Sequence, residues 1–407
     1  MRGAPHSRRR DWWVAWLLCL APRLAALFAF WPDVTLDTSS GLIENGWLFT
    51  DIATPLWPPA YLALAEVLWR LTGGHLLAYA VAHVAIASLV GVFVLSVCRS
   101  LSLSTRAGWL AVLAVALLPY YVSTSVRQLD VGIVITVCAA FAAVMARWRA
   151  TAGSAPLMIR AAALTAMLLF LTRANALSLI VALYAVLLVA PGRVRRQHVV
   201  TSAGIFVVLM SVWSATNAAR FGAFTPFPAN TGVNLWLGNH AGAGAELMAR
   251  DFNPSNTLPV DVPADATLDG GDAYASDRAV SRLAWGYLLA HPAETVSNMG
   301  RKFVRYFDWR LDEQSPHGRV EQWAYTAPYL LMLICGAIGV GALWRTNRWA
   351  LLWLGTVVIG YLLPHLLAFG MIRFRMSVEW ATLILAAVGV DVLARAASPA
   401  YPLQRND

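Results

Sequence analysis

Long apolar runs alternate with short polar segments along this chain, and this pattern predicts membrane-spanning helices. A helix needs about 20 apolar residues to cross a hydrocarbon core about 30 Å thick. Ten runs come close to that length: residues 12–32, 75–97, 107–123, 130–147, 158–172, 175–191, 198–214, 325–344, 349–368 and 376–394. We therefore expect an all-α polytopic membrane protein with about ten transmembrane helices.

A further apolar segment, residues 58–71, decides the topology. As a helix its 14 residues cover only about 21 Å, and the segment contains Glu66 and Arg70. We place this segment in the membrane interface. If it crossed the membrane instead, every later loop would change sides.

The distribution of arginines tests this choice, because short cytoplasmic segments carry an excess of basic residues. With ten spans and a cytoplasmic N-terminus, sixteen arginines fall inside and five fall in short outer segments. The inner set is Arg2, Arg8, Arg9, Arg10, Arg99, Arg106, Arg147, Arg149, Arg160, Arg193, Arg195, Arg196, Arg345, Arg348, Arg395 and Arg405. The outer set is Arg70, Arg127, Arg173, Arg373 and Arg375. The bias supports ten spans with both termini cytoplasmic, and it singles out five outer arginines as candidates for binding an anion.

The segments outside the spans define the expected domains. An N-terminal transmembrane module covers residues 1–214 and includes an acidic first outer loop, residues 33–74. An extracytoplasmic cap covers residues 215–324, and a C-terminal transmembrane module covers residues 325–407. Within the cap, the amphipathic pattern over residues 273–309 predicts a juxtamembrane helix.

Composition narrows the possible functions. The chain is 58% hydrophobic and 13% charged, with a formal net charge of +9. Its basic residues lie in short clusters between apolar runs, so we exclude a nucleic-acid partner. Histidines and cysteines lack the spacing of a zinc site, and we expect no cofactor. A divalent cation held by carboxylates and a substrate phosphate stays open.

Several short motifs occur in a characteristic order along almost the whole chain. They are Trp31-Pro32-Asp33, Gly46, Trp57-Pro58-Pro59-Ala60-Tyr61, Ser125-Val126-Arg127-Gln128-Leu129-Asp130, Leu171-Thr172-Arg173-Ala174-Asn175, Asn230-Thr231-Gly232-Val233-Asn234-Leu235-Trp236-Leu237-Gly238-Asn239 and Arg373-Phe374-Arg375-Met376. Together they resemble the polyprenyl-phosphate-sugar-dependent glycosyltransferases of the GT-C fold. The branch they resemble is that of the protein O-mannosyltransferases and the lipid A aminoarabinose transferase.

The resemblance implies that a sugar passes from a polyprenyl phosphate to a hydroxyl of a glycan, lipid or protein acceptor on the outer face of the membrane. It implies an aspartate as general base, either Asp33 or Asp37. Asp37 stands where the family usually has a tyrosine, four positions after its acidic residue, so the choice between the two stays open.

The same resemblance assigns further residues. The donor phosphate would contact Arg373, Arg375, Arg173 and Arg127, and the polyprenyl tail would lie along Trp57, Pro59 and Tyr61. Other candidates are Asp130, Asn239 and His365. Each has a structural alternative, because aromatic residues anchor helices at the membrane interface and interfacial charges pair with each other.

Two other functions remain in view. The departure from the family pattern at Asp37 is compatible with an inactive scaffold of the same fold. A lipid or solute transporter would also use buried charge, but transporters usually show inverted repeats, and none is evident here. Arginine far outnumbers lysine, with Lys302 the only lysine, which suggests a GC-rich bacterial genome and therefore a bacterial inner membrane.

Overall fold

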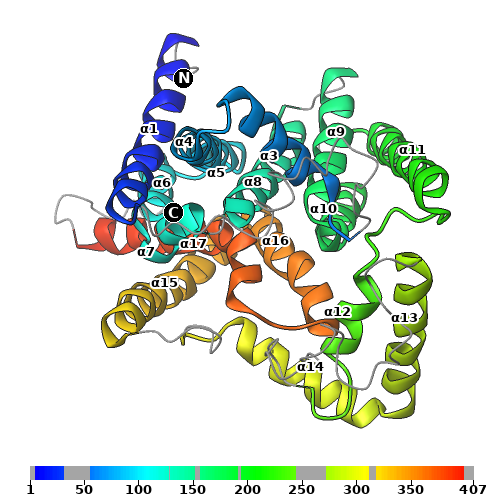
Figure 1. Ribbon diagram of the computed structural model, residues 1–407. Helices are drawn as coiled ribbons and strands as arrows, with labels where there is room; N and C mark the ends of the chain where they lie inside the picture. Colours follow the sequence, from blue (N-terminus) through cyan, green and yellow to red (C-terminus); the bar gives the residue numbers. More distant parts are fainter. Residues whose placement is uncertain are drawn as a thin grey trace.

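A computed structural model describes residues 5–31, 56–127, 129–151, 156–190, 194–243, 272–310 and 318–397. Every regular element in these ranges is a helix (Figure 1). The helices are α1 Pro5–Ala29, α3 Pro59–Leu71, α4 Leu76–Ala87, α5 Val90–Ser100, α6 Thr105–Leu117, α7 Pro119–Arg127, α8 Leu129–Ala150, α9 Pro156–Thr172, the short 3-10 helix η1 Ala174–Ala176, α10 Leu177–Val189, α11 Arg196–Phe221, α12 Thr231–Leu237, α13 Ala273–Ala290, α14 Pro292–Tyr306, α15 Arg319–Thr346, α16 Arg348–Leu367 and α17 Ile372–Ala396.

Seven helical segments among the described residues are long and apolar enough to cross a membrane. They are Arg9–Ala29, Leu76–Ser100, Asp130–Ala150, Arg196–Phe221, Gln322–Thr346, Arg348–Leu367 and Ile372–Ala396. The helices α6 and α7 form an eighth candidate that is bent by 54°. The bend lies where Pro119 removes a backbone N–H, so the span expected at residues 107–123 is not straight. The protein is thus an all-α, multi-pass membrane protein, as the apolar pattern predicts.

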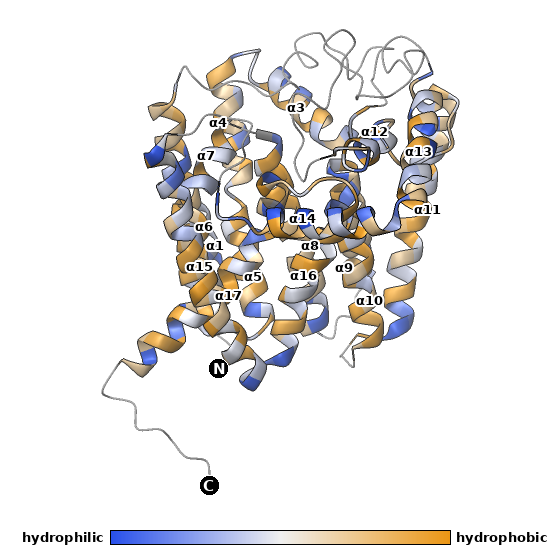
Figure 2. Cartoon of the chain, turned by 90° about the horizontal axis from the view of Figure 1, so that it is seen from below, coloured by the Kyte–Doolittle hydropathy of each residue, from blue (hydrophilic) through white to orange (hydrophobic). Residues whose placement is uncertain are grey.

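The helix bundle has two ends, and different elements lie at each of them. Figure 2 shows the start of α1 and the end of α17 at one end, and α12 and α13 at the opposite end. We call the first the terminal end and the second the cap end. At the terminal end, polar contacts join Asp11 to Arg99, Asn347 to the Leu101 carbonyl, and both Ser104 and Arg106 to Asp391.

The helix α3 does not carry the chain across the bundle. The pairing of Asp11 with Arg99 places the start of α1 beside the end of α5. Farther along, Leu27 packs against Ala80 and Val84 of α4. Because α1 and the pair α4–α5 are therefore antiparallel, α3 ends at the cap end, where α4 begins. The Leu56 carbonyl, just before α3, accepts a hydrogen bond from Asn230 at the start of α12, so α3 also begins at the cap end. This agrees with the expectation that residues 58–71 do not span the membrane.

The helices α15 and α17 approach each other so closely that side chains are excluded from their contact. A Cβ atom on Gly339 would lie 1.9 Å from the Leu385 carbonyl oxygen, and one on Gly389 would lie 1.9 Å from the Cys335 carbonyl oxygen. Small residues permit this kind of backbone contact between helices in membranes. The contact joins the second half of α15 to the second half of α17.

The amphipathic pattern over residues 273–309 folds as two helices, α13 and α14, rather than one. They meet at His291, after which Pro292 takes the first position of α14, where a missing N–H does no harm. Asp272 caps α13 by accepting a hydrogen bond of 2.9 Å from the Ala275 N–H. Figure 2 shows α14 lying across the bundle, at a large angle to α16.

Candidate functional site

Polar side chains from distant parts of the chain surround the ring of Phe374 near the start of α17. The guanidinium carbons of Arg373 and Arg173 lie 5.1 Å and 5.5 Å from the centroid of this ring. The imidazole of His365 stacks on it, with 4.5 Å between the ring centroids. Two cations and a histidine therefore share one aromatic ring, an arrangement that cation–π attraction supports.

Two more residues extend this group. The Nδ2 atom of Asn175 lies 3.3 Å from Nε2 of His365, and Oδ2 of Asp130 lies 3.7 Å from Nη1 of Arg173. We call Asp130, Arg173, Asn175, His365 and Arg373 the Phe374 cluster.

Helix ends position the cluster. Asp130 is in the first turn of α8, Arg173 lies between α9 and η1, His365 is in the last turn of α16, and Arg373 is in the first turn of α17. Because these helices alternate in direction, the four ends meet at the cap end of the bundle. Four of the five cluster residues are predicted site residues, and the fifth, Asn175, belongs to the arginine-bearing motif of residues 171–175.

The cluster is partly exposed and carries net positive charge. The side chains of Arg173 and Asp130 are 21% and 23% exposed, and Arg373 is also partly exposed. His365 is buried. The cluster holds two guanidiniums and one carboxylate, and all three are partly exposed. Such a group of charges is suited to binding a phosphate.

Arg375 lies two residues along α17 but in a very different environment. Its Nη1 atom donates to the carbonyl oxygens of Tyr306 (2.8 Å) and Asp308 (3.1 Å) and to the Tyr329 hydroxyl (2.9 Å), and Nη2 donates to the Tyr325 hydroxyl.

Arg375 also forms an ion pair with Glu379, at 3.3 Å, in which both side chains are almost fully buried. We call Arg375, Glu379, Tyr325 and Tyr329 the Arg375 network. Through these contacts the Arg375 guanidinium joins α14, α15 and α17 together.

Lys302 is a buried residue that lies outside every predicted motif. Its Nζ atom donates to Oδ1 of Asn239 (3.0 Å) and to the Leu367 carbonyl (3.2 Å). Burial, and then the charge of Arg301, lowers the pKa of Lys302 to about 7. Asn239, a predicted candidate, is thus a partner of this lysine, and its Nδ2 donates to the carbonyls of Leu235 and Leu367. The rarity of lysine in the chain was the only sequence signal that pointed to this position.

The residues expected to line a lipid groove separate in the structure. Trp57 is 46% exposed, whereas Tyr61 is buried, with its ring 5.7 Å from that of His83. Pro59 is the first residue of α3, and the Leu56 carbonyl just before it accepts a hydrogen bond of 2.7 Å from Asn230. This hydrogen bond ties the start of α3 to the segment that leads into α12.

For three predicted residues the structure does not describe the side chain. Asp33 and Asp37 are not among the described residues, and Arg127 is the last residue of α7 with a side chain that is not described. The prediction of a general base in the first outer loop therefore stays a prediction. In the described ranges, no group of three or more His, Cys, Asp or Glu side chains is placed to hold a metal ion.

The described geometry supports anion binding more directly than any other chemistry. The Phe374 cluster supplies two partly exposed guanidiniums, while the Arg375 network and Lys302 hold the surrounding segments together. Comparison with protein-family models and with curated proteins finds no match for this chain.

Proposed function

We propose that this protein is a membrane glycosyltransferase that moves a sugar from a polyprenyl-phosphate donor to a hydroxyl of a glycan, lipid or protein acceptor. The observation that carries this proposal is the convergence of Arg173 and Arg373, which are far apart in the sequence, on the ring of Phe374. The described contacts around that ring also include His365.

The charges suit the chemistry of this transfer. The acceptor oxygen forms a bond to the anomeric carbon, the bond from that carbon to the phosphate oxygen breaks, and the acceptor proton passes to a carboxylate. Negative charge then develops on the departing polyprenyl phosphate. Guanidiniums held in place beforehand stabilise such a charge, and the loss of one such donor typically reduces the rate by about 10²- to 10³-fold.

We assign Arg173 and Arg373 to the donor phosphate, with Asp130 holding Arg173 in position through their ion pair. Asp33 or Asp37 remains the proposed general base. Arg375 takes a supporting role instead of a direct contact with the phosphate, because its own hydrogen bonds and ion pair engage it within the protein.

The proposed topology has ten crossings in a bacterial inner membrane. They are the seven long segments, the bent pair α6–α7, and α9 and α10, which are apolar but shorter. The terminal end, where arginines such as Arg99 and Arg395 lie, would be cytoplasmic by the excess of positive charge. The cap end, with the Phe374 cluster, would then face outward.

The test is a transfer assay with the full-length protein in nanodiscs, offered a panel of radiolabelled polyprenyl-phosphate sugars and a membrane extract as acceptor. The variants are Arg173→Gln, Arg373→Gln, Asp33→Asn and Asp37→Asn. Arg70→Gln is the matched control, because Arg70 is also predicted to be an outer arginine but pairs with Glu66 on α3, outside the cluster.

We expect transfer to fall by about 100-fold in either cluster variant and in one aspartate variant, while the Arg70 variant stays near wild type. A wild-type protein that transfers no sugar but binds polyprenyl phosphate would replace the proposal with a scaffold. Movement of the lipid across the membrane without transfer would replace it with a transporter.

A further inference from the structure

The helix α14 exposes several apolar side chains and buries several polar ones. Val296 and Val304 are each 68% exposed and Phe303 is 48% exposed, whereas Asn298 and Lys302 are buried. The outer side of α14 therefore combines large apolar side chains with the exposed Arg301. A helix that lies along a membrane protein with its apolar side outward is stabilised by contact with lipid.

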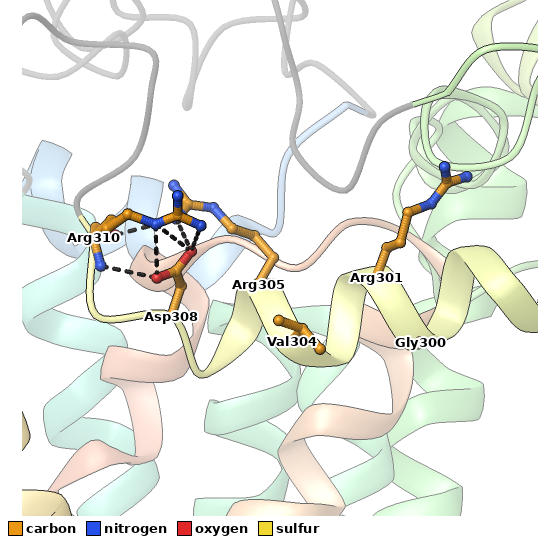
Figure 3. Close-up of a pocket in the computed structure, with 6 residues that line it drawn as sticks. All are labelled: Gly300, Arg301, Val304, Arg305, Asp308 and Arg310. Atoms are coloured by element: carbon orange, nitrogen blue, oxygen red, sulfur yellow. Dashed lines mark hydrogen bonds and ion pairs between the residues drawn. The ribbon is translucent and has the colours of Figure 1, made fainter.

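A hollow of about 390 Å³ opens beside the second half of this helix. Figure 3 shows its lining residues, which are Gly300, Arg301, Val304, Arg305, Asp308 and Arg310. A Cβ atom on Gly300 would meet nothing within 4 Å, so a glycine leaves this side of α14 open. The hollow has an apolar side chain, Val304, between charged ones.

Asp308 holds two of the three arginines in fixed positions. Its Oδ2 atom lies 2.8 Å from Nη1 of Arg305 and 2.8 Å from Nη2 of Arg310. Burial alone would raise the pKa of Asp308, but hydrogen bonds from Arg310 and Arg305 lower it to about 2, so the carboxylate stays ionised near neutral pH.

The third arginine completes a positively charged rim. Arg301 is exposed, and its Nη2 atom donates to Oδ1 of Asn298 (3.2 Å), on the buried side of α14. With three guanidiniums and one carboxylate, the lining carries an excess of positive charge. Arginine beside exposed apolar side chains at a membrane surface matches a phospholipid, which joins a phosphate to acyl chains.

We propose that the hollow beside α14 binds the phosphate of an anionic phospholipid from the surrounding bilayer, with the acyl chains lying against the exposed apolar residues of the helix. Arg301 and Arg310 contact the phosphate, while Arg305 and Asp308 hold the rim in place. This is a second anion site, separate from the Phe374 cluster. This second site binds a lipid of the bilayer and does not bind the sugar donor.

The test measures binding of fluorescent phosphatidylglycerol to the full-length protein in nanodiscs of phosphatidylcholine. The variants are Arg301→Gln, Arg310→Gln and the double variant. Arg301→Gln changes an exposed side chain and therefore disturbs folding little. Arg310→Gln also removes hydrogen bonds to the buried Asp308, so the Arg301 variant carries the test if the Arg310 variant unfolds early. Arg282→Gln is the matched control, because Arg282 is an exposed arginine of the neighbouring helix α13 and does not line the hollow. Thermal unfolding of each variant is recorded in parallel.

We expect affinity for phosphatidylglycerol to fall by about five-fold in each single variant, because an arginine near an anionic surface contributes about that factor. The double variant loses more, the control loses little, and added salt weakens wild-type binding. Equal losses in the control and the double variant would overturn the proposal. Binding of polyprenyl phosphate at this hollow with no response to phosphatidylglycerol would also overturn it, and would assign the hollow to the donor.

Discussion

Arg373 and Arg375 lie two residues apart at the start of α17, yet they belong to two different regions. Arg373 is partly exposed over the ring of Phe374, in a cluster that also includes Arg173 and His365. Arg375 is buried in a network of tyrosine hydroxyls, backbone carbonyls and Glu379. The same residue type therefore lies in two different environments, because different groups surround each guanidinium.

The surroundings of a guanidinium distinguish an arginine that can bind a ligand from one that stabilises the fold. A buried guanidinium that is engaged by the protein contributes to stability, because removing it leaves its partners unsatisfied. A partly exposed guanidinium beside other cations can accept an external anion at little cost to folding. Mutations in the Arg375 network should therefore lower the free energy of unfolding, whereas mutations in the Phe374 cluster should lower the rate of sugar transfer.

The largest expected effect follows Arg375→Gln. This change leaves Glu379 buried without its ionic partner, which typically costs about 3 to 5 kcal/mol of unfolding free energy. Thermal unfolding in nanodiscs, followed by tryptophan fluorescence, should show a clear drop in midpoint. The double variant Arg375→Gln with Glu379→Gln should recover part of the loss, since it removes the unpaired charge. An Arg375→Gln protein that unfolds at the wild-type temperature would contradict this account of the network.

The next effect is on activity and concerns the Phe374 cluster. Arg173→Gln and Arg373→Gln should each reduce sugar transfer by about 100-fold while leaving the unfolding midpoint near wild type. Because both guanidiniums are assigned to one phosphate, the double variant should lose less than the product of the single losses. Strictly multiplicative losses would show that the two arginines act on different groups.

A smaller effect concerns Lys302, a buried cation whose described partners are the neutral oxygens of Asn239 and Leu367. Burial, together with the charge of Arg301, lowers its pKa from 10.5 to about 7. Between these values the unfolded chain holds a proton that the folded chain has released, so folding stability from this group rises as the pH increases. Unfolding midpoints at about pH 6 and about pH 9 should therefore differ more for the wild type than for Lys302→Met. An equal pH response in both proteins would argue against a buried, titrating lysine.

The smallest expected effect follows Asp130→Asn. The pair between Asp130 and Arg173 is 3.7 Å long and partly exposed, so its loss should change stability by less than about 1 kcal/mol. Transfer should fall by less than about ten-fold, because Arg173 stays in place but is held less firmly. A loss as large as that in Arg173→Gln would move Asp130 from a positioning role to a direct one.

Much of the fold could be predicted from the order of apolar and polar residues. The apolar runs correspond to helices, and residues 58–71 form a helix that does not cross the bundle. Two local details could not be predicted from the sequence. The bend between α6 and α7 and the break between α13 and α14 each depend on a proline, Pro119 and Pro292, whose effect varies with its position in a helix.

The candidate site was predictable only as a set of residues at one end of the bundle. The motifs around Arg173 and Arg373 were visible in the sequence, but nothing local could show that the two side chains share the ring of Phe374. Equally, Lys302 had no motif of its own, and its contact with Asn239 joins segments that are far apart in the chain.

The sequence by itself determined that the chain is a multi-pass membrane protein and where most of its helices lie. These properties depend on hydropathy and charge that are read along short stretches, so a linear pattern is sufficient. Only the tertiary structure decided that Arg373 is partly exposed and Arg375 is enclosed. The environment of a charge is set by groups from distant helices, here Tyr325, Tyr329 and the Asp308 carbonyl, and no local pattern encodes their approach.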